Sequence, residues 1–157
     1  MGAELSPAAR RVQRLLGELG SDSQVVQLAA TARSAADAAA VGCSVAQICK
    51  SLIFRASGGN PVLVIASGSN RVDEKKIAAA LGEAIVKADA DFVRDRTGYA
   101  IGGVAPIGHA APPRIFIDAD LFHHDVVWAA AGHPHAVFAV SPAELLRMTG
   151  GAVVRVA

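Results

Sequence analysis

Residues 97–109, TGYAIGGVAPIGH, form the most informative stretch of this chain. Four of its thirteen residues are glycines, one is a proline and most of the others are apolar, whereas a flexible linker would be polar. Glycine allows positive φ and close approach of the backbone, and Pro106 stiffens the exit from the stretch. Such a loop can direct backbone N–H groups at a ligand, as an oxyanion or phosphate site requires. A tight turn packed beneath a sheet is the other interpretation of the same residues.

The composition bounds the class of protein. A chain of 157 residues with 52% hydrophobic and 18% charged residues indicates one compact domain, spanning residues 1–157. The formal net charge of +1 excludes strong sequence-independent binding to nucleic acid, so DNA is not an expected partner. The sequence shows neither a signal peptide nor an apolar run of the roughly 20 residues that a membrane helix needs. We therefore expect a soluble, cytoplasmic protein without a membrane partner.

The hydrophobic pattern and the turn residues predict short strands interleaved with helices. This order indicates the α/β (α+β) class, with a mixed, curved sheet flanked by helices. The predicted helices are 6–20, 34–42, 73–82, 89–96 and 141–150. The predicted strands are 24–28, 49–55, 61–67, 85–86, 114–118, 126–130, 136–140 and 153–156, of which the second and third form a hairpin around residues 57–60.

Lys50 is the most unusual single residue. Alternation along its strand places Lys50 on the same face as Leu52 and Phe54. A lysine on an apolar face needs a reason, because an unpaired buried charge is costly. The residue pattern leaves two readings open: a functional lysine, or a strand-end lysine whose ammonium reaches water.

The other reactive side chains carry weaker signals. Cys43 and Cys49 have no metal-ligand spacing and are expected to be buried structural thiols in a reducing compartment. His133 and His135 flank a proline, so we expect a loop there rather than a metal site. The charged segment 70–76 is typical of a solvated helix start, although its cations could also contact RNA phosphates.

Four segments together, residues 47–54, 67–76, 97–109 and 131–135, resemble the YbaK/prolyl-tRNA-synthetase-associated editing domain family. The resemblance runs from about Ser6 to the C-terminus. It implies an aminoacyl-tRNA deacylase that hydrolyses the ester of a wrong, small amino acid, on the tRNA for proline. The implied partners are the acceptor end of an aminoacylated tRNA and prolyl-tRNA synthetase, and no metal or other cofactor is implied. A non-catalytic tRNA- or synthetase-binding module and a small-molecule acyl-ester hydrolase are the alternatives.

The resemblance also implies roles for individual residues. Lys50 matches the family's lysine and would be catalytic, together with Gly102, the first glycine of the family's GxxxP loop. Gly103 and Pro106 of that loop would bind substrate, as would His109, which follows it directly. His133, in a His-Pro pair similar to one found in alanyl-editing relatives, would shape the amino-acid pocket.

Overall fold

The computed structural model describes residues 5–28 and 41–157. The four helices of the described residues are α1 (Pro7–Glu18), α3 (Glu74–Leu81), α4 (Ala90–Thr97) and α5 (Pro142–Thr149). The strands are β1 (Val25–Gln27), β2 (Cys49–Ala56), β3 (Pro61–Ser67), β4 (Ile85–Lys87), β5 (Arg114–Asp118), β6 (Val127–Ala130), β7 (Ala136–Val140) and β8 (Ala152–Val154). Two 3₁₀ turns, Val45–Gln47 and Ala119–His123, complete these elements. The predicted α/β class is confirmed. Of the helix predicted over 34–42, residues 34–40 lie outside the described residues.

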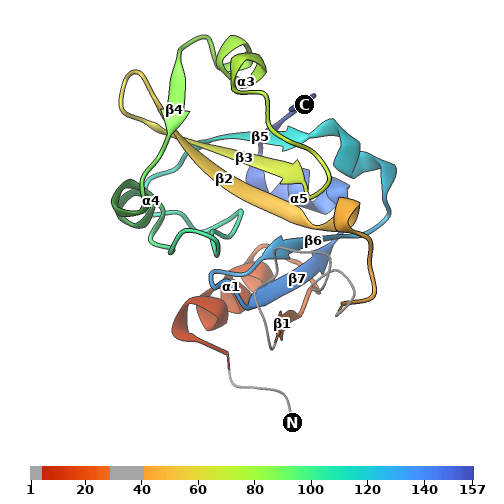
Figure 1. Ribbon diagram of the computed structural model, residues 1–157. Helices are drawn as coiled ribbons and strands as arrows, with labels where there is room; N and C mark the ends of the chain where they lie inside the picture. The colour runs from red at the N-terminus through yellow and green to blue at the C-terminus, as the bar shows by residue number, and fades with distance from the viewer. Residues whose placement is uncertain (1–4, 29–40) are drawn as a thin grey trace.

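The strands are distributed over two sheets (Figure 1). A five-stranded sheet has the order β4-β2-β3-β5-β8 and is mixed, because β3, β5 and β8 are parallel and the other pairs antiparallel. A three-stranded antiparallel sheet has the order β1-β7-β6. The sequence predicted one mixed sheet; the described residues form two sheets, which a parallel bridge between Ile48 and Trp128 connects.

Local sequence signals explain where the helices begin and end. Each of the four helices starts after a residue whose side chain accepts a hydrogen bond from a main-chain N–H in the first turn. These residues are Ser6, Asp73, Asp89 and Ser141. Three of the helices end at a glycine in the left-handed conformation, namely Gly82, Gly98 and Gly150.

The core lies on both faces of the five-stranded sheet. Every residue of the central strand β3 is buried. In Figure 1, α3 lies above this sheet, while α1 and the three-stranded sheet lie below it. Phe54 and Val64 pack with Ile77 of α3 above, and Ile53 and Leu63 pack with the larger cluster below. Beyond β4, none of the strands in residues 5–28 and 41–157 pairs with this edge of β2, since β4 pairs only with residues 54–56.

Among the described residues, no helix has the length and apolar character that crossing a membrane requires.

Candidate functional site

Two adjoining cavities open along the uncovered edge of β2. The first, which we call the β4 cavity, has a volume of about 380 Å³ and also contacts α3 and β4. The second, the β6 cavity, has a volume of about 330 Å³ and also contacts β6 and β7. Four residues line both cavities and form their shared wall: Lys50, Ser51, Leu52 and Ile101. Strand β2, which carries the predicted catalytic residue Lys50, therefore separates the β4 cavity from the β6 cavity.

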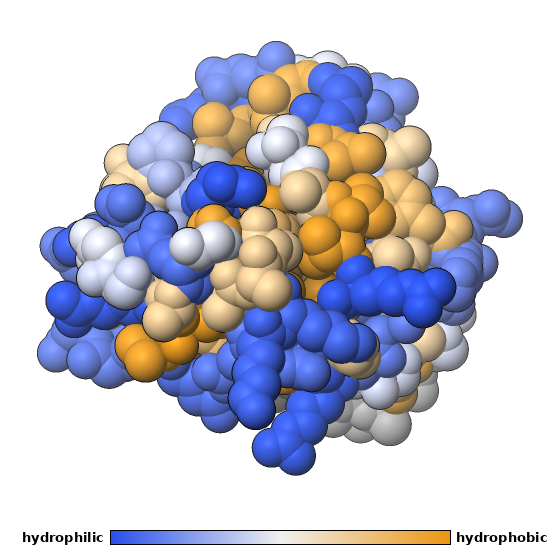
Figure 2. All heavy atoms as spheres, turned by 90° about the horizontal axis from the view of Figure 1, so that it is seen from above, coloured by the Kyte–Doolittle hydropathy of each residue, from blue (hydrophilic) through white to orange (hydrophobic). Residues whose placement is uncertain are grey.

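The two cavities differ in charge. Arg71, Glu74 and Lys87 line the β4 cavity in addition to Lys50, which gives it three cations and one carboxylate. In the β6 cavity Lys50 is the one residue of a charged type among the described lining residues, and the rest is mainly apolar, including Trp128 and Val137. Figure 2 shows the face seen from above, where apolar residues gather near the centre and hydrophilic residues surround them. A charged ligand group suits the first compartment and an apolar group the second.

Lys50 is half-buried and held at its tip. Its Nζ donates a hydrogen bond to the main-chain carbonyl of Asn70, in the loop after β3. Lys50 lies opposite Ala66 in the hairpin, on the face of β2 that carries Leu52 and Phe54, as alternation predicted. Its ammonium is thus held by a main-chain acceptor rather than free in solvent.

A cluster of polar residues behind Lys50 was not predicted from the sequence. The side-chain nitrogen of Asn70 donates to Asp118 Oδ2 and to Asp120 Oδ2, each at 2.8 Å. Asp118 is 1% exposed and accepts a further bond from the main-chain N–H of Ser67 at 2.9 Å. Because β3 and β5 are parallel neighbours, the residues that follow their carboxyl ends meet at the same end of the sheet. This pairing joins strands that are far apart in the sequence, so no local pattern identified the cluster.

The glycine-rich loop reaches both cavities from the other side. Gly102 has φ of 88° and lines the β6 cavity, so it shares that cavity with Lys50. The N–H of Gly103 donates to the carbonyl of Ala100 at 3.0 Å and closes a tight turn. Within the described residues, the N–H groups of Gly102 and Val104 have no acceptor. Gly102 lines the β6 cavity and Val104 lines the β4 cavity, so each of these two donors belongs to a residue beside one cavity.

Gly103 supports the loop from behind. A Cβ at this position would lie 2.7–2.8 Å from the main-chain atoms of His133 and Pro134. His133 lies in a turn, as its proline neighbour suggested, and its Nδ1 accepts from the N–H of His135 at 3.1 Å. Gly103 and His133 thus contact each other, and the described lining of the two cavities includes neither. A direct substrate contact by either residue stays a prediction.

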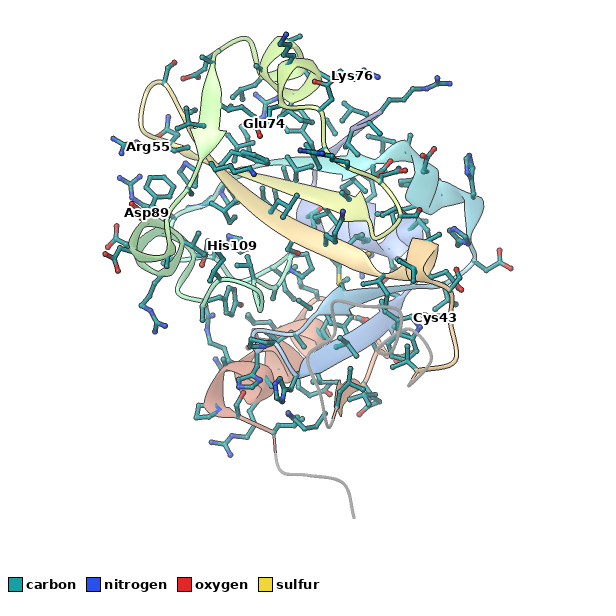
Figure 3. All side chains as sticks on the ribbon, viewed as in Figure 1. Cys43, Arg55, Glu74, Lys76, Asp89 and His109 are labelled. Atoms are coloured by element: carbon teal, nitrogen blue, oxygen red, sulfur yellow. The ribbon has the colours of Figure 1, made fainter. Side chains whose placement is uncertain are left out.

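Pro106 and His109 face a different compartment. Both line a third cavity of about 360 Å³, together with residues of α1 and α5 such as Leu15 and Met148. In Figure 3, His109 lies below β2 whereas Glu74, which lines the β4 cavity, lies above it. The structure therefore does not bring Pro106 and His109 together with Lys50 and Gly102.

The hydrogen bond and the burial of His109 indicate a structural role. Its Nε2 lies 2.5 Å from the carbonyl oxygen of Ala105, which can only accept, so Nε2 carries the proton. Burial lowers the pKa of His109, with a smaller contribution from the Arg11 cation, while the bond to Ala105 opposes the shift. His109 is therefore neutral at neutral pH and holds the loop from its rear face.

Helix α1 anchors the same loop. Arg11 donates to the carbonyl of Gly108 at 2.7 Å and to the hydroxyl of Tyr99 at 3.2 Å. The Tyr99 hydroxyl in turn donates to the carbonyl of Ile107 at 2.7 Å, and burial raises its pKa. With both ends tied, the loop can present its N–H groups in a fixed arrangement, as preorganised stabilisation of charge requires.

Neither cysteine is an activated nucleophile. Burial raises the pKa of the Cys49 thiol far above its ordinary value, and the charge of Asp118 adds to this effect. Cys43 is half-buried, and burial raises its pKa as well. The part of the chain that the structure describes holds no group of three or more His, Cys, Asp or Glu side chains arranged for a metal ion.

Comparison with known proteins gives the family of the chain. Residues 29–148 match the model of the aminoacyl-tRNA editing domain. The uncharacterised protein YwhH of Bacillus subtilis (strain 168) is 34% identical over 116 residues, which cover 74% of this chain and 73% of YwhH.

Two solved structures share the fold over nearly the whole chain. A protein described as a proposed trans-editing enzyme for prolyl-tRNA synthetase is 44% identical, with a TM-score of 0.91 and coverage of 97% of this chain and 98% of that one. The hypothetical protein APE2540 is 27% identical, with a TM-score of 0.85 and coverage of 93% and 98%.

Proposed function

Because this chain belongs to the aminoacyl-tRNA editing domain family, we propose that it is a deacylase that hydrolyses the ester of a mischarged aminoacyl-tRNA. The observation that carries the proposal is the position of Lys50 on the wall between a cationic and an apolar cavity. An aminoacyl-tRNA end has the same division: a nucleotide with phosphates on one side of the ester and an amino acid on the other. Residues 1–157 would act as a single editing domain in the cytoplasm.

In this arrangement the β4 cavity holds the terminal nucleotide. Arg71 and Lys87 at its lining supply positive charge for phosphate oxygens. The β6 cavity receives the amino-acid side chain among Trp128, Ala130 and Val137. The ester then lies at the shared wall, within reach of Lys50 and the loop at Gly102.

Hydrolysis requires a water molecule to attack the ester carbonyl carbon. The water oxygen first bonds to this carbon and the carbonyl oxygen becomes an oxyanion; the bond to the ribose oxygen then breaks, and a proton of the water ends on that ribose oxygen. Negative charge that develops on the carbonyl oxygen is stabilised by the N–H groups of Gly102 and Val104. Lys50 positions the nucleotide or the ester. The described residues of the shared wall include no imidazole or carboxylate, so we assign activation of the water to positioning and to the substrate's own groups.

We further propose that the amino acid is small and that the tRNA is that for proline. The support is the 44% identity to the protein described as a proposed trans-editing enzyme for prolyl-tRNA synthetase. A complex with prolyl-tRNA synthetase is part of the same proposal.

A panel of aminoacylated tRNAs tests the proposal. Wild-type protein is incubated with alanyl-, seryl-, cysteinyl- and prolyl-tRNA for proline, and with alanyl-tRNA for alanine, and loss of the ester is followed against buffer. We expect accelerated loss from a mischarged proline tRNA and little from the correct pairs. Binding of the tRNA without ester loss would favour the alternative of a non-catalytic binding module. Hydrolysis of simple acyl esters alone would favour a small-molecule esterase.

A further inference from the structure

Ser51 lies in a gap along the edge of β2. On one side of the gap, β4 pairs with residues 54–56, and the N–H of Ala88 donates to the carbonyl of Ile53 at 3.3 Å. On the other side, Ile48 forms the parallel bridge to Trp128. Between them no strand of the described residues covers Ser51, which lines both cavities.

The hairpin register shows where the main-chain groups of Ser51 point. The carbonyl of Ile48 accepts from Gly68, and the N–H of Ala56 donates to Asn60, so the even-numbered residues of β2 form their hydrogen bonds toward β3. In an antiparallel pair, alternate residues direct these groups to opposite edges. The N–H and carbonyl of Ser51 therefore point away from β3, toward the open edge.

The side chain of Ser51 faces a similar gap in its hydrogen bonding among the described residues. Its Oγ is buried and forms no hydrogen bond with any of the described residues. Ser67, on the neighbouring strand, shows the usual arrangement: its hydroxyl donates to the carbonyl of Ala46 at 2.7 Å. A buried hydroxyl without a partner is unfavourable, and a ligand that supplies one removes this cost.

We propose that Ser51 binds the α-ammonium group of the aminoacyl ester. The main-chain carbonyl oxygen and the hydroxyl oxygen of Ser51 both accept hydrogen bonds from this group. This inference rests on the proposed function. An α-ammonium needs acceptors, and no carboxylate is among the described residues that line the β6 cavity. Alternation directs the side chain of Lys50 to the opposite face of β2, so its cation does not share the face of the Ser51 hydroxyl. An ammonium group held at Ser51 leaves the amino-acid side chain in the β6 cavity and the ester beside Gly102.

The test changes one partner on each side of the contact. Alanyl-tRNA is converted by nitrous acid into lactyl-tRNA, which keeps the ester and the methyl group and has a hydroxyl in place of the amine. Wild type, Ser51→Ala and Ser51→Thr are compared on both esters, each rate being divided by the rate of that ester in buffer. Ser51→Thr keeps the hydroxyl and suits a strand.

We expect Ser51→Ala to lose roughly tenfold in kcat/KM on alanyl-tRNA, the scale of one hydrogen bond to a charged group, and little on lactyl-tRNA. Ser51→Thr retains most of the preference for the amine. Equal losses on the two esters, or unchanged rates on both, would overturn the assignment of Ser51 and leave the deacylase intact. Failure of wild type on every aminoacyl ester of the panel would instead contradict the proposed function itself.

Discussion

Lys50 donates a hydrogen bond through Nζ to the main-chain carbonyl of Asn70. The side chain of Asn70 is itself fixed by bonds of 2.8 Å to Asp118 and Asp120. The carbonyl that holds the lysine is thus positioned by two carboxylates, and one of them, Asp118, is buried at the end of β5. The position of the Lys50 ammonium consequently depends on residues that lie far from Lys50 in the sequence.

Replacing Asn70 should disturb this arrangement. Asn70→Ala removes both bonds and leaves the buried Asp118 with fewer donors, so we expect a loss of about 1–2 kcal/mol in the free energy of unfolding. We also expect deacylation per folded molecule to fall by roughly tenfold, because the carbonyl that holds Lys50 is no longer fixed. Urea denaturation and ester hydrolysis on one preparation measure the two effects. Asn60→Ala, the same change at an exposed turn residue, is the control.

A second prediction concerns packing behind the glycine loop. Gly103→Ala places a Cβ at 2.7 Å from the main chain of His133, so one of the two loops must move. We expect a loss of about 1–3 kcal/mol in the free energy of unfolding. Gly17→Ala is the matched control, since its Cβ meets no described atom within 4 Å and it lies in helix α1. It should stabilise by about 0.5–1 kcal/mol. Equal stability of the two variants would show that the loops are not in tight contact.

Gly102 allows a separate test of the N–H donors. Its φ of 88° disfavours any residue with a Cβ, so Gly102→Ala should cost about 1–2 kcal/mol in the free energy of unfolding. If the N–H at this position stabilises the oxyanion, kcat should also fall by roughly 10²-fold. Thermal midpoint and rate, measured together, separate the two effects. A destabilised variant with an unchanged rate per folded molecule would make this loop a structural turn only.

The lowered pKa of His109 predicts that the stability of the folded protein depends on pH. Its pKa in the folded protein lies below the ordinary value of 6.5, so the unfolded chain takes up the proton first as the pH falls. The contribution of neutral His109 is therefore fully present above about pH 6.5 and is lost below it, toward the folded pKa. Thermal midpoints of wild type and His109→Gln between pH 8 and pH 5 test this. The variant should show a smaller decrease than wild type, while His123→Gln, at an exposed residue, should follow wild type. Parallel curves for wild type and His109→Gln would contradict the assignment.

The parts of the fold that were predicted correctly depend on neighbours in the sequence. The β2–β3 hairpin follows from two apolar runs around a turn at residues 57–60, and its observed register pairs Arg55 with Pro61. The helices follow from local caps such as Asp73 and Ser141. The position of Lys50 beside Leu52 and Phe54 needed only the alternation of a strand.

The rest of the site depends on contacts between distant segments. Asn70 and Asp118 are 48 residues apart and meet because β3 and β5 pair in parallel, which no local pattern encodes. Conversely, His109 lies seven positions after Gly102 in the sequence, yet the chain turns and carries it to a different cavity. Proximity in sequence was the reason to group the two, and the path of the loop separates them.

The most direct test of the account is deacylation by a Lys50→Ala variant. Wild type, Lys50→Ala and the surface control Arg14→Ala, at an exposed residue of α1, are given limiting alanyl-tRNA for proline under single-turnover conditions, with thermal midpoints measured on the same samples. Wild type and Arg14→Ala should remove the ester well above the rate in buffer. Lys50→Ala should fall to near that rate while it remains folded, because the lysine of the wall between the two cavities is gone. Near-normal turnover by a folded Lys50→Ala protein would contradict the assignment of this site.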